Sequence, residues 1–89
     1  EQDQLIKITT GLLTNLRRNI RTNTKKRVNI SADVATMISS QQQDFSYGAR
    51  PIKRLITEQI ETPLADYIIE HPDQHIIHVE TLNSNIHIK

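Results

Sequence analysis

The chain has no cysteine among its 89 residues, and aromatic side chains make up only 3% of it. Without cysteine it can form neither a disulfide framework nor a thiolate metal site. With so few aromatic residues, its core must be aliphatic and built mostly from Ile, Leu and Val. No apolar run approaches the roughly 18 residues that a membrane span requires, and no signal-peptide pattern opens the chain.

Size and charge balance indicate one small folded domain over residues 1–89. Charged residues make up 24% of the chain and the formal net charge is +1, which excludes a disordered, highly charged tail. A chain of this length can bury a single modest core. It begins at Glu1 without an initiator Met, and a helical pattern starts almost at once, so we expect a fragment of a longer polypeptide.

Charge is unevenly distributed along the chain. Residues 1–40 carry seven Lys/Arg against three acidic residues, and residues 41–89 carry four against seven. Six cations form one basic run: Arg17, Arg18, Arg21, Lys25, Lys26 and Arg27. Such a run is one footprint of a nucleic-acid-binding module, but cations also suit a solvated helix C-terminus. No aromatic residue lies nearby to stack a base, which favours the second interpretation.

The first half of the chain predicts a helix, a strand and a second helix. A 3.6-residue apolar period predicts the first helix over residues 3–21; its apolar positions are Leu5, Ile8, Leu12, Leu13, Leu16 and Ile20. The alternation in "RVNIS" predicts a short strand. Ser31 is a good N-cap for a second helix, whose inward residues are Val34, Ala35, Met37 and Ile38.

The second half predicts a long helix and a hairpin. Pro51 suits the first position of a third helix, whose apolar stripe continues to Ile68. At Pro63 we expect a kink, or a close restart capped by Thr62, without a change of direction. "HIIHVETLNSNIHIK" reads as a terminal hairpin with "LNSN" near the turn. The fold class is therefore α+β, with a three-helix core and a small three-stranded sheet.

One motif, "SYGARPIKR" at residues 46–54, places cations where a helix disfavours them. The start of a helix is the positive end of its dipole, and each cation there costs a few tenths to about 1 kcal/mol. On a helix starting at Pro51, Lys53 and Arg54 lie on the same face as Arg50. Free backbone N–H groups and a planar guanidinium both suit phosphate oxygens, so the motif predicts an anion site. The alternatives are pairing of these cations with Glu58 and Glu61, or an ordinary solvated basic face.

The same motif carries a family resemblance. "YGARPIKR" followed by "ITEQIETPLADYII" resembles the C-terminal small (lid) subdomain of the second AAA+ module in Clp-type unfoldases and disaggregases, the group of ClpB, ClpC, ClpE and ClpA. The family pattern is Gly-Ala-Arg-Pro-Leu-Lys/Arg-Arg, then Ile-Glu-x-Pro-Leu-Ala. Ile52 occupies the Leu position of the first part, and residues 60–65 match the second. The order of elements extends the similarity over nearly the whole chain.

The resemblance implies a role in an ATP site. In that family the arginine of Gly-Ala-Arg is the sensor-2 residue, which reaches the phosphates of ATP bound, with Mg²⁺, in the upstream large subdomain. This assigns nucleotide binding to Gly48, Ala49 and Arg50, with the two small residues allowing close backbone approach. The implied parent is a cytoplasmic homohexamer that unfolds or disaggregates protein substrates. Its small subdomain packs against neighbouring protomers, and some members deliver substrates to a ClpP-type peptidase.

The chain lacks the other parts of such a site. It has no GxxxxGK[ST] loop and no apolar strand ending in paired acids, so we do not expect it to be an enzyme on its own. Two other interpretations stay open: a nucleic-acid-binding module using Arg17–Arg27, and a ligand-free oligomerisation domain.

Four histidines, His71, His75, His78 and His87, raise the question of zinc. Period-2 alternation places His75 and His78 on opposite faces of their strand. No cysteine or well-placed carboxylate completes a tetrahedron, so we expect no metal.

Overall fold

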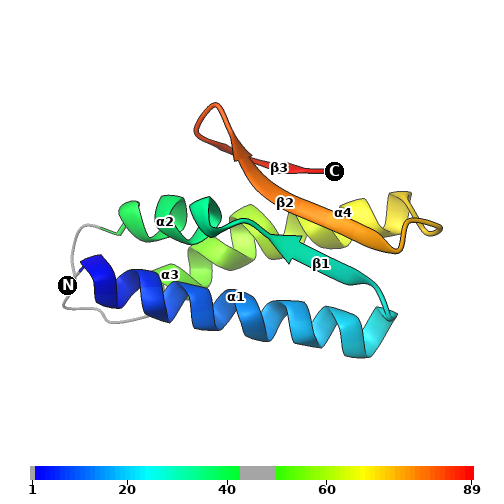
Figure 1. Ribbon diagram of the computed structural model, residues 1–89, viewed down its shortest axis with the longest axis horizontal. Coiled ribbons are helices and arrows are strands. Elements are labelled where there is room, and N and C mark those ends of the chain that lie inside the picture. The colour runs from blue at the N-terminus through cyan, green and yellow to red at the C-terminus, as the bar shows by residue number, and fades with distance from the viewer. Residues whose placement is uncertain (1, 43–49) are drawn as a thin grey trace.

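The computed structural model describes residues 2–42 and 50–89. Three helical segments and a three-stranded sheet share one core (Figure 1), which confirms the predicted α+β class and element order. The elements are α1 (Gln2–Thr24), β1 (Arg27–Ile30), α2 (Ala32–Ser40), α3 (Arg50–Ile56), a π-helical turn η2 (Thr57–Glu61), α4 (Thr62–Glu70), β2 (Ile76–Leu82) and β3 (Asn85–Ile88).

Helix α1 is the longest single element and runs a few residues beyond its predicted end. It buries Leu5, Leu13 and Leu16 on its inward face. It ends at Thr24, and the next residue, Lys25, adopts a left-handed backbone conformation with φ 63°. The Lys25 N–H donates to the Arg21 carbonyl oxygen at 2.9 Å, so one of the orphan carbonyls of the helix end is satisfied.

Helix α2 starts where the sequence predicts, but its cap works differently. Ser31 occupies the N-cap position, yet its side chain makes no capping hydrogen bond. Instead the Val34 N–H donates to the Ser31 backbone carbonyl oxygen at 3.1 Å. Of the residues that the pattern places inward, Val34, Ala35 and Ile38 are buried, whereas Met37 is only partly buried. Ser39 is buried as well.

The third predicted helix is continuous from α3 through η2 to α4, and it does not restart at Pro63. Thr62, the expected cap, has helical φ and ψ of −65° and −49°. Its N–H donates to the carbonyl oxygen of Thr57, five residues back. This wider turn comes directly before Pro63, which has no N–H and whose ring crowds the carbonyl four residues back. The predicted irregularity is therefore present as a π-turn.

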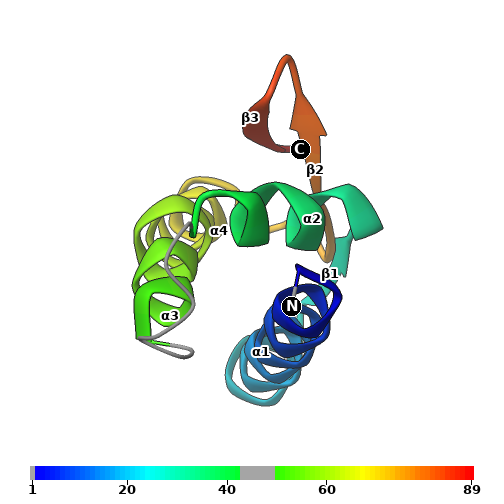
Figure 2. The same cartoon turned by 90° about the vertical axis from the view of Figure 1, so that its left-hand side faces the viewer.

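The sheet has the strand order β1-β2-β3. β1 pairs with β2 in parallel, with Val28 opposite Ile77. β2 and β3 form the predicted antiparallel hairpin, with Val79 opposite Ile88. In Figure 2 the tip of this hairpin projects away from the helices, on the side opposite α1.

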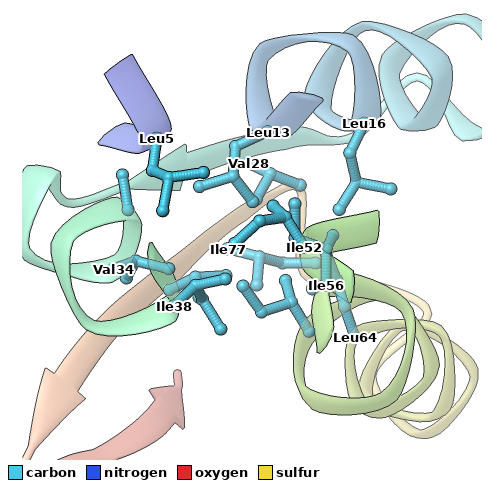
Figure 3. Close-up of a cluster of buried hydrophobic side chains, with 13 residues drawn as sticks. Leu5, Leu13, Leu16, Val28, Val34, Ile38, Ile52, Ile56, Leu64 and Ile77 are labelled. Carbon is cyan, nitrogen blue, oxygen red and sulfur yellow. The ribbon is translucent and has the colours of Figure 1, made fainter. Parts of the chain in front are cut away.

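The core is aliphatic throughout the described residues. Side chains from both ends of the chain converge on it (Figure 3). The buried hydrophobic residues are Leu5, Leu13, Leu16, Val28, Val34, Ala35, Ile38, Ile52, Ile56, Ile60, Leu64, Ile77 and Val79. Within the described ranges, no helix is both long enough and apolar enough to cross a membrane.

The turn of the hairpin yields a stability prediction. Asn83 and Ser84 have φ values of 52° and 64°, as a type I′ turn requires, and this conformation favours glycine. Replacing Ser84 with glycine should stabilise the protein by roughly 0.5–1 kcal/mol, because glycine adopts positive φ without the Cβ clash.

Asn85→Gly is the matched control, since it places the same residue in the extended strand β3. There it should destabilise by a similar amount. Urea unfolding of the two variants measures both effects. A loss of stability in Ser84→Gly would contradict the assigned turn.

Candidate functional site

The basic motif lies on the solvent face of α3. Ile52 and Ile56, 0% and 6% exposed, fix the opposite face of this helix in the core. Arg50, Lys53 and Arg54 are all exposed, as the spacing predicts. The core therefore holds the helix in one orientation and presents three cations to solvent.

The cations differ in their partners. Arg54 Nε lies 3.8 Å from Glu58 Oε1, and both side chains are largely exposed, so this pair contributes at most about 1 kcal/mol. Within residues 2–42 and 50–89, the side chains of Arg50 and Lys53 make no hydrogen bond or ion pair. Pairing with Glu58 or Glu61, the alternative to an anion site, is therefore found among the described residues for Arg54 but not for Arg50 or Lys53.

The other predicted site residues, Gly48 and Ala49, lie outside the described residues. Close beside the motif, Lys53 and Ile56 line a small groove between α3 and α1 with a volume of about 240 Å³. Glu61, the second candidate partner, lines the same groove. Its carboxylate accepts a hydrogen bond from the Thr57 hydroxyl at 3.4 Å.

The histidines lie in different local environments. The His71 ring stacks on Tyr67, with centroids 4.0 Å apart, and its Nδ1 lies 2.9 Å from the Tyr67 carbonyl oxygen. His75 precedes β2, whereas His78 belongs to β2 and His87 to β3. Among the described residues, no group of three or more His, Asp or Glu side chains is arranged to hold a metal ion.

One member of the basic run has a structural role that the sequence did not reveal. Lys26 is only 7% exposed. Its ammonium group donates to the carbonyl oxygens of Gln74 at 2.7 Å, Pro72 at 2.8 Å and His71 at 3.4 Å. These carbonyls belong to the loop after α4, so Lys26 ties the start of β1 to the end of the long helix. The partners are 45 to 48 residues away in sequence, and no local pattern indicates them.

The remaining arginines of the run line a second surface. Arg17, Arg18, Arg21 and Arg27 are exposed around a groove of about 380 Å³ between α1 and β1. This groove shares no lining residue with the groove between α3 and α1 that Lys53 lines.

Comparison with known proteins identifies the family. The family described as the C-terminal, D2-small domain of ClpB protein matches residues 1–80. The ATP-binding subunit ClpE of the ATP-dependent Clp protease from Streptococcus pneumoniae is 31% identical over 93 aligned positions, covering 99% of this chain and 12% of that protein. The chaperone protein ClpB from Staphylococcus aureus is 36% identical over 69 positions, covering 76% of this chain and 8% of that protein.

The chain thus belongs to the D2-small family of Clp-type AAA+ chaperones, as the motif resemblance implied. It spans about an eighth or less of the length of these two relatives. What the relatives do as whole proteins is therefore attributed to this chain only as a proposal.

Lys26 provides a test of the structural assignment. Lys26→Met should destabilise the protein by roughly 2–4 kcal/mol, because two short charge-assisted hydrogen bonds are lost and their carbonyls lose a buried partner. Lys7→Met, at an exposed position of α1, serves as the control and should change stability by less than about 0.5 kcal/mol. Thermal and urea unfolding compare the variants. Equal stabilities would show that the Lys26 contacts contribute nothing.

Proposed function

We propose that this chain is the lid subdomain of a hexameric Clp-type ATPase and that Arg50 is its sensor-2 residue. In this role the Arg50 guanidinium contacts the phosphates of ATP held in an upstream large subdomain. The parent protein unfolds or disaggregates protein substrates in the cytoplasm. The family membership supports the general class. The specific role rests on Arg50, which is exposed and has no hydrogen-bond or ion-pair partner among the described residues.

The chemistry of the motif fits one part of a nucleotide site. A guanidinium carries a permanent charge and a planar set of donors, which match phosphate oxygens in a bidentate geometry. The described residues include no carboxylate cluster suited to Mg²⁺, and the sequence has no phosphate-cradling loop. In this proposal Mg²⁺ and most of the ATP contacts therefore belong to the large subdomain.

The arrangement of the chain also supports the proposal. Figures 1 and 2 show α3 at the same end of the molecule as the start of α1. A large subdomain joined upstream of α1 would lie at this end, within reach of the Arg50 surface.

A movement of Arg50 would be transmitted through the fold. The helical segment from Arg50 to Glu70 is continuous, and Lys26 ties the loop after it to β1. A shift of Arg50 toward or away from phosphate would therefore reorient the helix and sheet together. Such coupling lets nucleotide state bias a two-state arrangement of lid and large subdomain, and contacts with the neighbouring protomer would sense the change.

Replacing Arg50 in the intact parent tests this role. Arg50→Ala should lower ATP turnover by about tenfold or more, because a charged contact to the phosphates is lost from the transition state. Arg54→Ala removes the same charge one turn further along the helix and should leave turnover within about twofold. Steady-state phosphate release and nucleotide affinity are measured for both variants. Near-normal turnover in Arg50→Ala would refute the assignment.

The separated chain provides a second test. Purified residues 1–89 should not hydrolyse ATP and should bind nucleotide only weakly, because the phosphate loop and the Mg²⁺ ligands are absent from the sequence. Phosphate release and calorimetric titration measure these properties. Hydrolysis that Arg50→Ala abolishes would show that these residues contain a complete site.

A further inference from the structure

Four exposed arginines have no charge partner among the described residues. The guanidinium groups of Arg17, Arg18, Arg21 and Arg27 make no hydrogen bond or ion pair with any residue in the described parts of the chain. The two ion pairs found there, Arg54–Glu58 and Lys89–Glu80, lie on other elements. Like charges held on neighbouring positions repel one another, so an external anion would relieve this cost.

The helix dipole explains only part of the cluster. Arg21 lies in the last turn of α1, where a cation is favoured. Arg17 and Arg18 lie further from the end, and the dipole effect falls off within the last turn. Arg27 belongs to β1, so the dipole of α1 does not account for its position.

The arginines surround a concave surface that continues along α1. The groove of about 380 Å³ between α1 and β1 adjoins a second groove of about 310 Å³ between α1 and α2, and both include Thr14 and Arg17. Half of the residues that line the second groove are apolar, among them Ile6, Leu13 and Ala35. We call the two adjoining grooves together the α1 groove; its first part is the more basic and its second part the more apolar.

We propose that the α1 groove binds an extended acidic segment of a protein partner. Carboxylates of the segment pair with the arginine cluster, and small apolar side chains follow into the part lined by Ile6, Leu13 and Ala35. Arginine suits this ligand because its planar donor set binds carboxylates in a bidentate manner. This binding is independent of the nucleotide contact proposed for Arg50.

The lining of the groove favours a peptide over a nucleic acid. None of the residues that line either part is aromatic, so the α1 groove offers no platform for stacking bases. Arg18, Arg21 and Arg27 line only the first part, and Arg17 is the one cation that also lines the second, so the positive charge does not continue along the groove as a phosphate backbone would require. A peptide whose acidic residues are followed by apolar ones complements both the arginine-lined part of the groove and the part lined by Ile6, Leu13 and Ala35.

Fluorescence anisotropy with the 89-residue protein tests the proposal. The probe is a fluorescein-labelled peptide with a run of glutamates followed by valine and alanine, and its matched counterpart carries glutamines instead. The glutamate peptide should bind at least about tenfold more tightly than the glutamine peptide at low salt. Equal binding of the two peptides would overturn the proposal.

Two double variants locate the binding site. Arg17→Ser/Arg21→Ser should weaken binding of the glutamate peptide by about tenfold or more. Lys53→Ser/Arg54→Ser removes the same charge from α3 and should change it by less than about twofold. All four positions are exposed, so both proteins should keep the parent's urea midpoint. Equal weakening by the two double variants would show that only net charge matters.

The variant Thr10→Trp distinguishes binding of the peptide within the groove from simple electrostatic attraction to the arginines. Thr10 is exposed and lines the apolar part, so a bulky side chain there should obstruct the peptide and weaken its binding by about fivefold. A labelled single-stranded DNA oligonucleotide is the competing probe. The surface would instead be a nucleic-acid site if the DNA binds more tightly than the glutamate peptide, if Arg17→Ser/Arg21→Ser weakens DNA binding, and if Thr10→Trp leaves it unchanged.

Discussion

The fold depends on an apolar stripe of four-residue steps along the helix from Arg50 to Glu70. Ile52, Ile56, Ile60 and Leu64 are all buried against the other helices and the sheet. In a regular α-helix each such step overshoots a 3.6-residue turn by about 0.4 residue, so the stripe would drift around the helix. The π-turn at Thr57–Glu61 holds more residues per turn and brings the stripe back into phase. The same turn accommodates Pro63, so one local irregularity serves both packing and continuity.

This buried stripe sets the orientation of both ends of the helix. At the first end, burial of Ile52 and Ile56 leaves Arg50 directed to solvent. At the other end, Lys26 binds the carbonyls of the loop after α4, and Tyr67 and Gln74 hydrogen bond to each other at 2.7 Å. The helix is therefore anchored along its length and at its far end. The sensor-2 role proposed for Arg50 would require this rigidity between that residue and the body of the domain.

The sequence predicted features that depend on local patterns and missed those that depend on distant contacts. The apolar period from Leu5 to Ile20 correctly predicted α1, and "LNSN" correctly predicted the β2–β3 turn, because apolar spacing and turn chemistry are local properties of the sequence. Ser31 was placed correctly at the start of α2, but its expected side-chain cap is absent. The role of Lys26 and the adjoining parts of the α1 groove arise only when the folded chain brings distant segments together. The sequence placed Arg50 on an exposed face, and the role proposed for it rests on the family motif.

The proposal that Arg50 contacts ATP is tested most directly by a structure of the intact parent protein with a bound ATP analogue. If Arg50 is the sensor-2 residue, its guanidinium should lie within hydrogen-bond distance of a phosphate oxygen, at about 3 Å, while Ile52 and Ile56 stay packed in this subdomain's core. An Arg50 side chain that points away from the nucleotide, or that pairs with a carboxylate in the nucleotide-bound ring, would contradict it.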